Sequence, residues 1–139
     1  MHQTAEATRQ AVPARAGRRG AAILAFDRLQ SRDRAAAALI GLVASARGVP
    51  PILLLHRSRC AAEVALARQV AMYLMHVVLT RNMTDIGHYF RRDRTTVTHA
   101  CAQMEDMRDD PAFDAEMTEL EQAIAVMQEA VEHPHAAAR

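Results

Sequence analysis

Four consecutive residues late in the chain carry side chains that can bond to nucleic acid: Asp93, Arg94, Thr95 and Thr96. A carboxylate can accept a hydrogen bond from cytosine or adenine, and a guanidinium can donate to guanine or to phosphate. Threonine methyl groups can touch the thymine methyl group, and threonine hydroxyls can bond base edges or phosphates. This string has the chemistry of a base-reading site if a helix presents it outward.

The pattern around the string predicts such a helix. With about 100° per residue, Val97, Cys101 and Met104 form an apolar stripe, and the opposite side collects the polar residues Thr95, Thr96, His99, Gln103 and Asp106. A generic amphipathic surface helix would show the same division, so the face by itself leaves both interpretations open.

Capping residues place this helix second in a pair. Asn82 followed three residues later by Asp85 predicts the start of a helix of barely two turns, ending at Phe90. Two arginines then form a turn, and Asp93 is the predicted N-cap of a helix over residues 95–108. Two short helices joined in this way fit a helix-turn-helix, in which the second helix enters the major groove.

The remaining elements are also predicted to be helical. The chain has 139 residues, 50% of them hydrophobic, with 4% aromatics and 5 glycines. Helices are expected over residues 21–29, 35–47, 62–79 and 112–131. Apolar residues at helical spacing form the predicted core side of the last two: Ala67, Val70, Ala71, Leu74 and Val78 in one, and Phe113, Met117, Leu120, Ile124 and Met127 in the other. We predict an all-α helical bundle over residues 21–131, with a disordered basic arm over residues 1–20 and a flexible tail over residues 132–139.

Charge is divided unevenly along the chain. Residues 1–94 hold 15 Arg against 6 acidic residues, whereas residues 95–139 hold 2 Arg against 10. The basic part favours a polyanionic partner, and the acidic part would repel nucleic acid if it lay on the same face. A solvated helix surface is the alternative interpretation of the same charges.

Three motifs together resemble a known family. Residues 92–100 (RDRTTVTHA) resemble the RDHTTVLHA signature of the C-terminal DNA-binding domain, domain IV, of the bacterial replication initiator DnaA. Residues 68–74 (RQVAMYL) are similar to its R-Q-x-A-M-Y-L helix, and residues 85–90 (DIGHYF) to its E-I-G-x-x-F. The similarity covers about residues 35–124. It implies a Trp-repressor-like helical bundle that recognises the T-rich DnaA box.

The resemblance also implies a set of DNA contacts. The matching positions read bases at Asp93, Arg94, Thr95 and Thr96 and contact the DNA backbone at Arg68, Gln69 and His99, and we add Arg92 as a phosphate contact. Either Arg57 or Arg59 would enter the minor groove, with a solvated loop as the alternative. His76 stands where the family often has a basic side chain, and a histidine at a helix edge is the alternative.

Two departures from the family bear on sequence preference. The family has two glycines between the Phe and the RD pair, whereas here Phe90 is followed by Arg91 and Arg92, one residue shorter and without glycine. Because glycine often supplies a positive φ there, we expect the turn to differ. Arg94 replaces the usual His, an exchange that favours guanine or phosphate.

Other classes of function lack their motifs. There is no GxxxxGK[ST] loop and no GxGxxG, so we expect no ATPase, bound nucleotide or other cofactor. No catalytic arrangement has supporting context, and the histidines do not have metal-binding spacing. The longest apolar run, residues 49–55, contains two prolines and is too short to span a membrane.

The two cysteines lack a CxxC motif, and Cys101 is expected to be a buried hydrophobic residue in a reduced, cytoplasmic protein.

These features give a leading interpretation and two alternatives. The first is a stand-alone domain IV relative, associated with the nucleoid, that binds double-stranded DnaA-box-like DNA in the origin region and modulates chromosomal replication initiation. The second is an interaction module that binds DnaA or a factor that inactivates DnaA. The third is a helix-turn-helix transcription regulator with an unrelated site.

Overall fold

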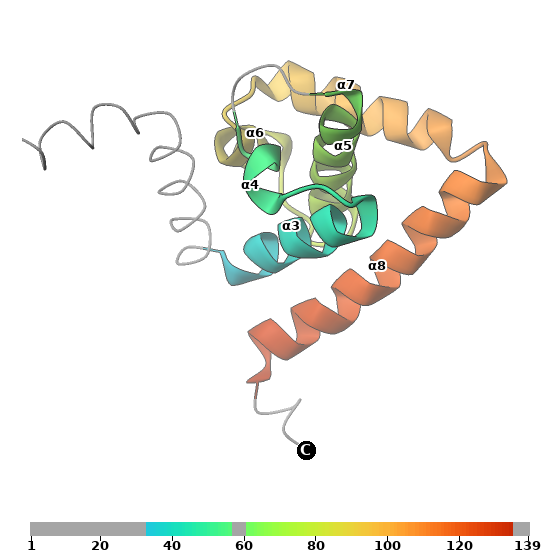
Figure 1. Cartoon of the computed structure of the whole chain (residues 1–139). Helices are drawn as coiled ribbons and strands as arrows, with labels where there is room; N and C mark the ends of the chain where they lie inside the picture. Colours follow the sequence, from blue (N-terminus) through green and yellow to red (C-terminus); the bar gives the residue numbers. More distant parts are fainter. Residues whose placement is uncertain (1–32, 57–60, 135–139) are drawn as a thin grey trace, which may run out of the picture.

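The computed structural model describes residues 33–56 and 61–134 (Figure 1). In these ranges the chain forms helices only, with no strand, so the all-α prediction is confirmed. The helices are α3 (Arg34–Arg47), α4 (Pro51–Leu54), α5 (Ala62–Val77), α6 (Met83–Phe90), α7 (Arg94–Met107) and α8 (Pro111–Glu132). The predicted arm, the predicted helix over residues 21–29, the loop arginines Arg57 and Arg59, and residues 135–139 lie outside the described residues.

Local signals set the ends of α3. The Asp33 carboxylate accepts a hydrogen bond from the Ala36 amide at 3.1 Å, which supplies one of the acceptors that a helix start lacks. At the other end Gly48 has a φ of 68°, the left-handed conformation that closes a helix at low cost to glycine. Pro51 then opens the single turn of α4, where its missing N–H is harmless.

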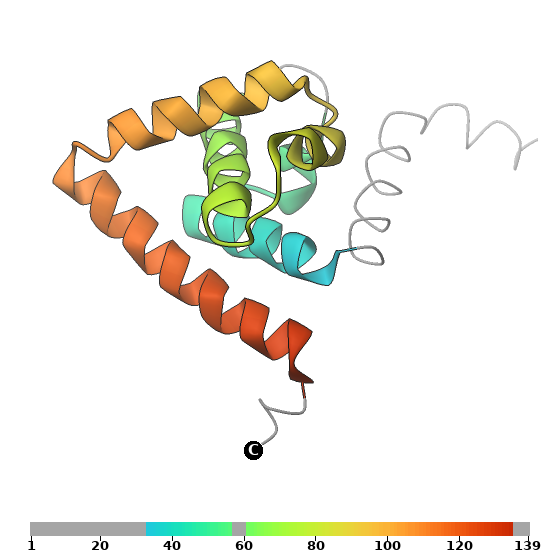
Figure 2. The ribbon, with the colours of Figure 1, turned by 180° about the vertical axis from the view of Figure 1, so that it is seen from behind.

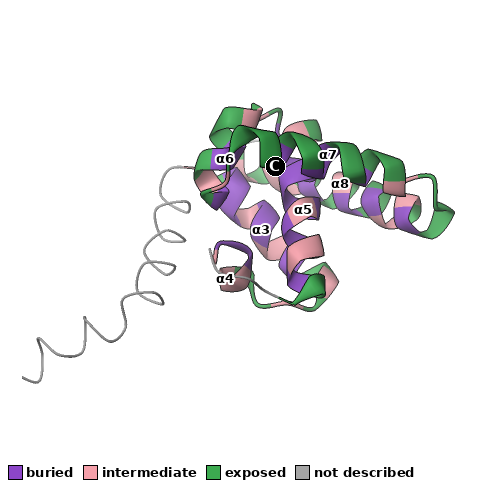
Figure 3. Cartoon of the chain, turned by 90° about the horizontal axis from the view of Figure 1, so that it is seen from above, coloured by how far each residue is buried: buried purple, intermediate pink, exposed green. Residues whose placement is uncertain are grey.

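The core surrounds α5, which packs against α3, α4, α6 and α7. As predicted, Ala67, Val70, Ala71 and Leu74 are fully buried, whereas Val78 follows the helix and is half-buried. Met72, Tyr73 and Met75 are buried as well, so α5 has almost no solvated face along this stretch. The burial pattern in Figure 3 shows α3 and α5 turned toward each other with their buried residues inside.

The last helix leaves α7 at a sharp corner and runs along α3 (Figures 1 and 2). Phe113, Met117, Leu120 and Ile124 are buried, and Met127 is half-buried, which confirms the predicted apolar stripe. Ion pairs support the edges of this contact. Arg47 of α3 reaches Glu116 at 2.9 Å, and Arg108 at the corner reaches Asp114 at 2.6 Å and Glu121 at 2.9 Å.

A polar cluster around Asp33 joins the start of α3 to α6. Arg81, in the connection between α5 and α6, donates to both carboxylate oxygens of Asp33, at 2.8 and 3.1 Å, and Tyr89 Oη of α6 donates at 3.1 Å. Burial opposes the carboxylate charge, but the hydrogen bonds from Arg81, Ala36 and Tyr89 outweigh it, so the pKa of Asp33 lies below its ordinary value. Burial and the neighbouring Asp33 charge raise the pKa of Tyr89 to about 12.

Within the described ranges, no helix has the length and apolar character needed to cross a membrane.

Candidate nucleic-acid interface

The short helix α6 starts as its sequence predicts. Asn82 Oδ1 accepts a hydrogen bond from the Asp85 amide at 2.8 Å, so the predicted N-cap is confirmed. Ile86 and Phe90 turn inward and are fully buried. Gly87 lies directly against the following turn, because a Cβ built there would be 2.6 Å from the Arg92 carbonyl oxygen. The backbones of α6 and the turn are therefore in direct contact.

The turn between α6 and α7 closes without glycine. Arg91 takes the left-handed conformation itself, with a φ of 53°. Its amide donates to the His88 carbonyl at 3.4 Å, and the Arg92 amide donates to the Gly87 carbonyl at 2.9 Å. A non-glycine residue in this conformation costs about 1 kcal/mol. The turn thus has a left-handed residue at the end of α6 without glycine, and that residue is an arginine with a strained backbone.

The first turn of α7 exposes the predicted base-reading string. Asp93 occupies the N-cap position with extended backbone, but its side chain makes no cap hydrogen bond, unlike those of Asp33 and Asn82. The side chains of Asp93, Arg94, Thr95 and Thr96 are all exposed. The opposite stripe, Val97, Ala100, Cys101 and Met104, is buried, which confirms the division of faces predicted from helical spacing.

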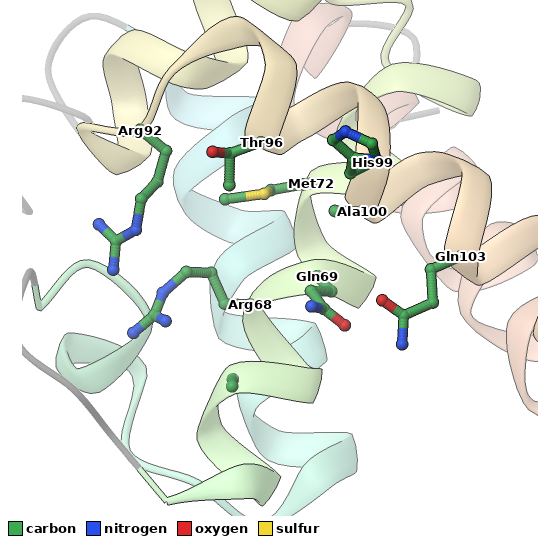
Figure 4. A pocket seen from close by; sticks show the side chains of 9 residues that line it. Arg68, Gln69, Met72, Arg92, Thr96, His99, Ala100 and Gln103 are labelled. Carbon is green, nitrogen blue, oxygen red and sulfur yellow. The ribbon is translucent and has the colours of Figure 1, made fainter.

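A groove of about 270 Å³ lies between α5 and α7 (Figure 4). Its polar lining comes from three elements: Arg68 and Gln69 of α5, Arg92 of the turn, and Thr96, His99 and Gln103 of α7. Ala65, Met72 and Ala100 complete the wall. No acidic residue is among these lining residues, so the groove presents two guanidinium groups and several neutral hydrogen-bonding groups.

Five of the predicted contact residues line this one groove: Arg68, Gln69, Arg92, Thr96 and His99. Asp93, Arg94 and Thr95 are exposed beside it in the first turn of α7. His76 is not among the lining residues, and its Nδ1 lies 3.0 Å from the Arg81 carbonyl oxygen at the end of α5. Gln103 lies on the predicted polar face but not among the predicted contacts, and its position two turns after Thr96 was the signal for including it.

Arg68 has a role within the fold that the sequence did not predict. Its side chain is 8% exposed, and it donates to the carbonyl oxygens of Leu54 at 2.8 Å, Leu53 at 3.0 Å and His56 at 3.2 Å. These carbonyls lie at the end of α4 and just after it, where a helix needs donors from outside, although the Leu53 carbonyl also accepts from the His56 amide at 3.2 Å. Arg68 therefore holds α4 against α5, and its contact with a phosphate stays a prediction.

The acidic helix is kept apart from the groove. α8 packs against α3, and no α8 residue lines the groove. At the corner before α8, Tyr73 Oη donates to Glu105 at 2.7 Å and accepts from Arg108 at 3.0 Å. Burial and the Glu105 carboxylate raise the pKa of Tyr73. The corner thus engages some of the acidic groups internally instead of directing them toward the groove.

Two chemical alternatives at this site find no support in the described ranges. Burial raises the pKa of the Cys101 thiol to about 11, as expected for the predicted hydrophobic residue and not for a reactive thiolate. No three or more His, Cys, Asp and Glu side chains gather there into a group that could hold a metal ion.

Comparison with known proteins agrees with this geometry. The family model described as the bacterial DnaA protein helix-turn-helix matches residues 36–104. The chain carries a DnaA-type helix-turn-helix domain. The match begins within α3 and ends at Met104 of α7, so it contains every described residue of the groove lining. It stops short of residue 124, where the resemblance was predicted to end, and leaves α8 outside.

Curated relatives of the DnaA-type domain are replication initiators. The chromosomal replication initiator protein DnaA of Deinococcus radiodurans is 35% identical over 83 residues, which cover 59% of this chain and 18% of that protein. The protein of the same name from Symbiobacterium thermophilum is 45% identical over 60 residues, 42% of this chain and 12% of that protein. The chain thus spans less than a fifth of the length of these relatives. Comparison with solved structures gives no significant match.

Proposed function

We propose that the chain binds double-stranded DNA with sequence preference at DnaA-box-like sites, with α7 in the major groove. The observation that carries this proposal is the groove between α5 and α7, which brings five predicted contact residues together beside the exposed first turn of α7. A recognition helix needs its first residues exposed and its opposite side packed, and α7 has both properties.

The exposed first turn of α7 and the groove beside it suggest different roles in binding the duplex. The exposed Thr95 and Thr96 would touch base edges and thymine methyl groups, and Arg94 and Asp93 would add a donor and an acceptor. Gln69 and His99, which line the groove, would donate to the DNA backbone and so fix the position of the helix on the duplex. The acidic helix α8 packs on α3, a location compatible with a polyanion at the groove.

We further propose that occupation of such sites in the origin region, by a protein associated with the nucleoid, modulates chromosomal replication initiation. The support is the name of the curated relatives, which are chromosomal replication initiator proteins, together with the location of the match in the helix-turn-helix. Because the chain covers less than a fifth of those proteins, the proposal extends to site binding and not to their other activities.

Binding assays with matched duplexes test the proposal. Fluorescence anisotropy at one fixed salt concentration should show tighter binding to a DnaA-box duplex than to a scrambled duplex of the same composition. Thr96→Ala should weaken binding to the box by roughly tenfold, since a good base contact is worth about 1–3 kcal/mol. Thr98→Ala is the matched control, because Thr98 lies on the same helix and donates to the Arg94 carbonyl at 3.0 Å. Equal affinity for both duplexes would refute sequence-specific binding.

An interaction module is the second candidate, and features of α8 favour it. α8 lies outside the family match, its charged residues are all Asp or Glu, and its Val126 is 72% exposed. Such a surface would suit a protein partner, either DnaA or a factor that acts on it. Capture of that partner from a cell lysate by the Thr96→Ala variant, at the level of the unchanged protein, would favour this candidate over base reading.

A transcription regulator with an unrelated site is the third candidate. It shares the helix-turn-helix with the first and differs only in where the protein binds. Mapping of the bound sites over the chromosome separates the two, because sites that avoid the origin region would favour transcription.

A further inference from the structure

Two guanidinium groups meet on one backbone oxygen beside the groove. Arg68 Nη2 of α5 donates to the His56 carbonyl at 3.2 Å, and Arg92 Nη2 of the turn donates to the same oxygen at 3.2 Å. Arg92 Nη1 also donates to the Phe90 carbonyl at 2.6 Å, at the end of α6. The His56 carbonyl therefore joins the residues after α4 to both α5 and the helix-turn-helix.

This junction involves the least regular part of the described fold. α4 is a single turn, too short to be stable without contacts from its neighbours. Arg68 supplies donors to Leu53, Leu54 and His56, and Arg92 supplies a second donor to His56 from the other side. Figure 4 shows the two side chains approaching the same region at one end of the groove.

The fork of Arg92 is thereby held in a defined direction. One of its nitrogens bonds to the end of α6 and another bonds beyond α4, so the residue just before the recognition helix is fixed at both ends of its guanidinium. A lysine has one compact ammonium group in place of the planar fork and cannot reproduce this pair of bonds. The observed pair of hydrogen bonds therefore requires the planar guanidinium of arginine as well as its positive charge.

We propose that Arg92 is a positioning residue of the DNA interface, acting through the His56 carbonyl to hold the start of α7 in register with α4 and α5. This inference rests on the proposed function and deepens it, because the sequence predicts only a phosphate contact at this position. The bridge sets the shape of the groove in which Arg68, Gln69, Thr96 and His99 meet the duplex.

Arg92→Lys and Arg92→Ala separate positioning from a phosphate contact. Both variants lose the bridge, so both should weaken binding to the box duplex to a similar degree, roughly tenfold. The slope of log affinity against log salt should stay that of the unchanged protein in both. Arg91→Lys is the matched control, because Arg91 is the exposed neighbouring arginine, and it should bind as the unchanged protein does.

The opposite pattern would overturn the proposal. If Arg92 served only as a phosphate contact, Arg92→Lys would bind normally, and Arg92→Ala would reduce the magnitude of the salt slope by roughly 0.9. Thermal unfolding of each variant checks that the domain remains folded, and the lysine variant carries the test if the alanine variant is unfolded.

Hydrogen exchange tests the bridge without DNA. The His56 amide donates to the Leu53 carbonyl at 3.2 Å, and the Leu55 amide to the Ile52 carbonyl at 3.2 Å. Peptides covering residues 52–56 should exchange faster in both Arg92 variants, while α3 and α8 exchange as before. Unchanged exchange in these peptides would refute the bridge. If the unchanged protein fails to bind DNA, the proposed function falls, and exchange alone decides whether Arg92 holds the groove.

Discussion

The helix-turn-helix and α8 show two ways in which one chain stabilises a helix. α6 and α7 are 8 and 14 residues long and are fixed by close backbone contact, a left-handed arginine and hydrogen bonds to carbonyl oxygens. α8 is 22 residues long and uses one apolar stripe with ion pairs at its edges. The proposed DNA interface therefore lies in the short helices that backbone contacts and hydrogen bonds to carbonyl oxygens hold in place, and not in the longest helix.

The largest expected effect tests whether α8 belongs to the same folded unit. Met117 is fully buried between α8 and α3, so Met117→Ala should lower the free energy of unfolding by about 3 kcal/mol. Urea denaturation followed by circular dichroism measures it. Val126→Ala on the exposed side of α8 is the control and should change stability by less than about 0.5 kcal/mol. Equal effects from the two substitutions would show that α8 does not dock.

Gly87→Ala tests the backbone contact inside the helix-turn-helix. The added Cβ would meet the Arg92 carbonyl oxygen at 2.6 Å, so the turn must shift, and we expect a loss of about 2 kcal/mol in unfolding free energy. Gly41→Ala in α3 is the matched control, because a Cβ there has no neighbour within 4 Å. That variant should gain about 0.5–1 kcal/mol, as alanine favours helix. A neutral Gly87→Ala would contradict the close contact.

The cluster at Asp33 predicts a loss of stability in acid. Because hydrogen bonds lower the pKa of Asp33 in the folded state, its contribution is complete above the ordinary carboxyl pKa of about 3.9 and is lost as the pH falls through the lower folded pKa. Asp33→Asn, which preserves a capping oxygen, should cost about 1 kcal/mol at pH 7. Urea titrations at pH 7 and pH 3 should show this difference shrinking, and a constant difference would count against the ion pair with Arg81.

The same cluster predicts a loss in alkali. The pKa of Tyr89 is about 12 in the folded protein, above the ordinary value of 10.0, so the unfolded chain releases its proton first. Stability should therefore decrease as the pH rises from about 10 to 12. Tyr89→Phe should weaken that decrease when unfolding is followed across this range.

The smallest effect concerns the strained turn. Arg91→Gly removes the penalty of a φ of 53° but frees the unfolded chain, and the balance should stabilise the domain by roughly 0.5 kcal/mol. Thermal denaturation measures the gain. A loss of stability would mean that the Arg91 side chain contributes more than its backbone strain costs.

Helix positions and faces were predictable wherever local signals act. Asn82, Gly48 and Pro111 mark helix ends in the sequence, and the stripes of α7 and α8 repeat with helical spacing, so these elements were predicted within about two residues. The single turn of α4 has no period to detect, and only its proline and apolar run were visible in advance.

The candidate site was predictable in membership but not in its bonding. The motifs named five residues that line the groove. Burial of Arg68 on the carbonyls of α4, and the bridge of Arg92 to His56, depend on the packing of separate helices and have no local signal. The position of His76 beside the Arg81 carbonyl also has no local signal, because it depends on the path of the connection after α5.

The absence of a side chain at Gly87 has a mechanical consequence. Because backbone atoms are in direct contact there, no flexible side chain can move aside between α6 and the turn. We therefore expect α6 and α7 to move as one rigid body. Spin labels at Thr84 and Ala102, both on the exterior, would then report the same separation in the free and the DNA-bound domain. Any bending that is needed for the domain and the DNA to fit together would then occur in the duplex.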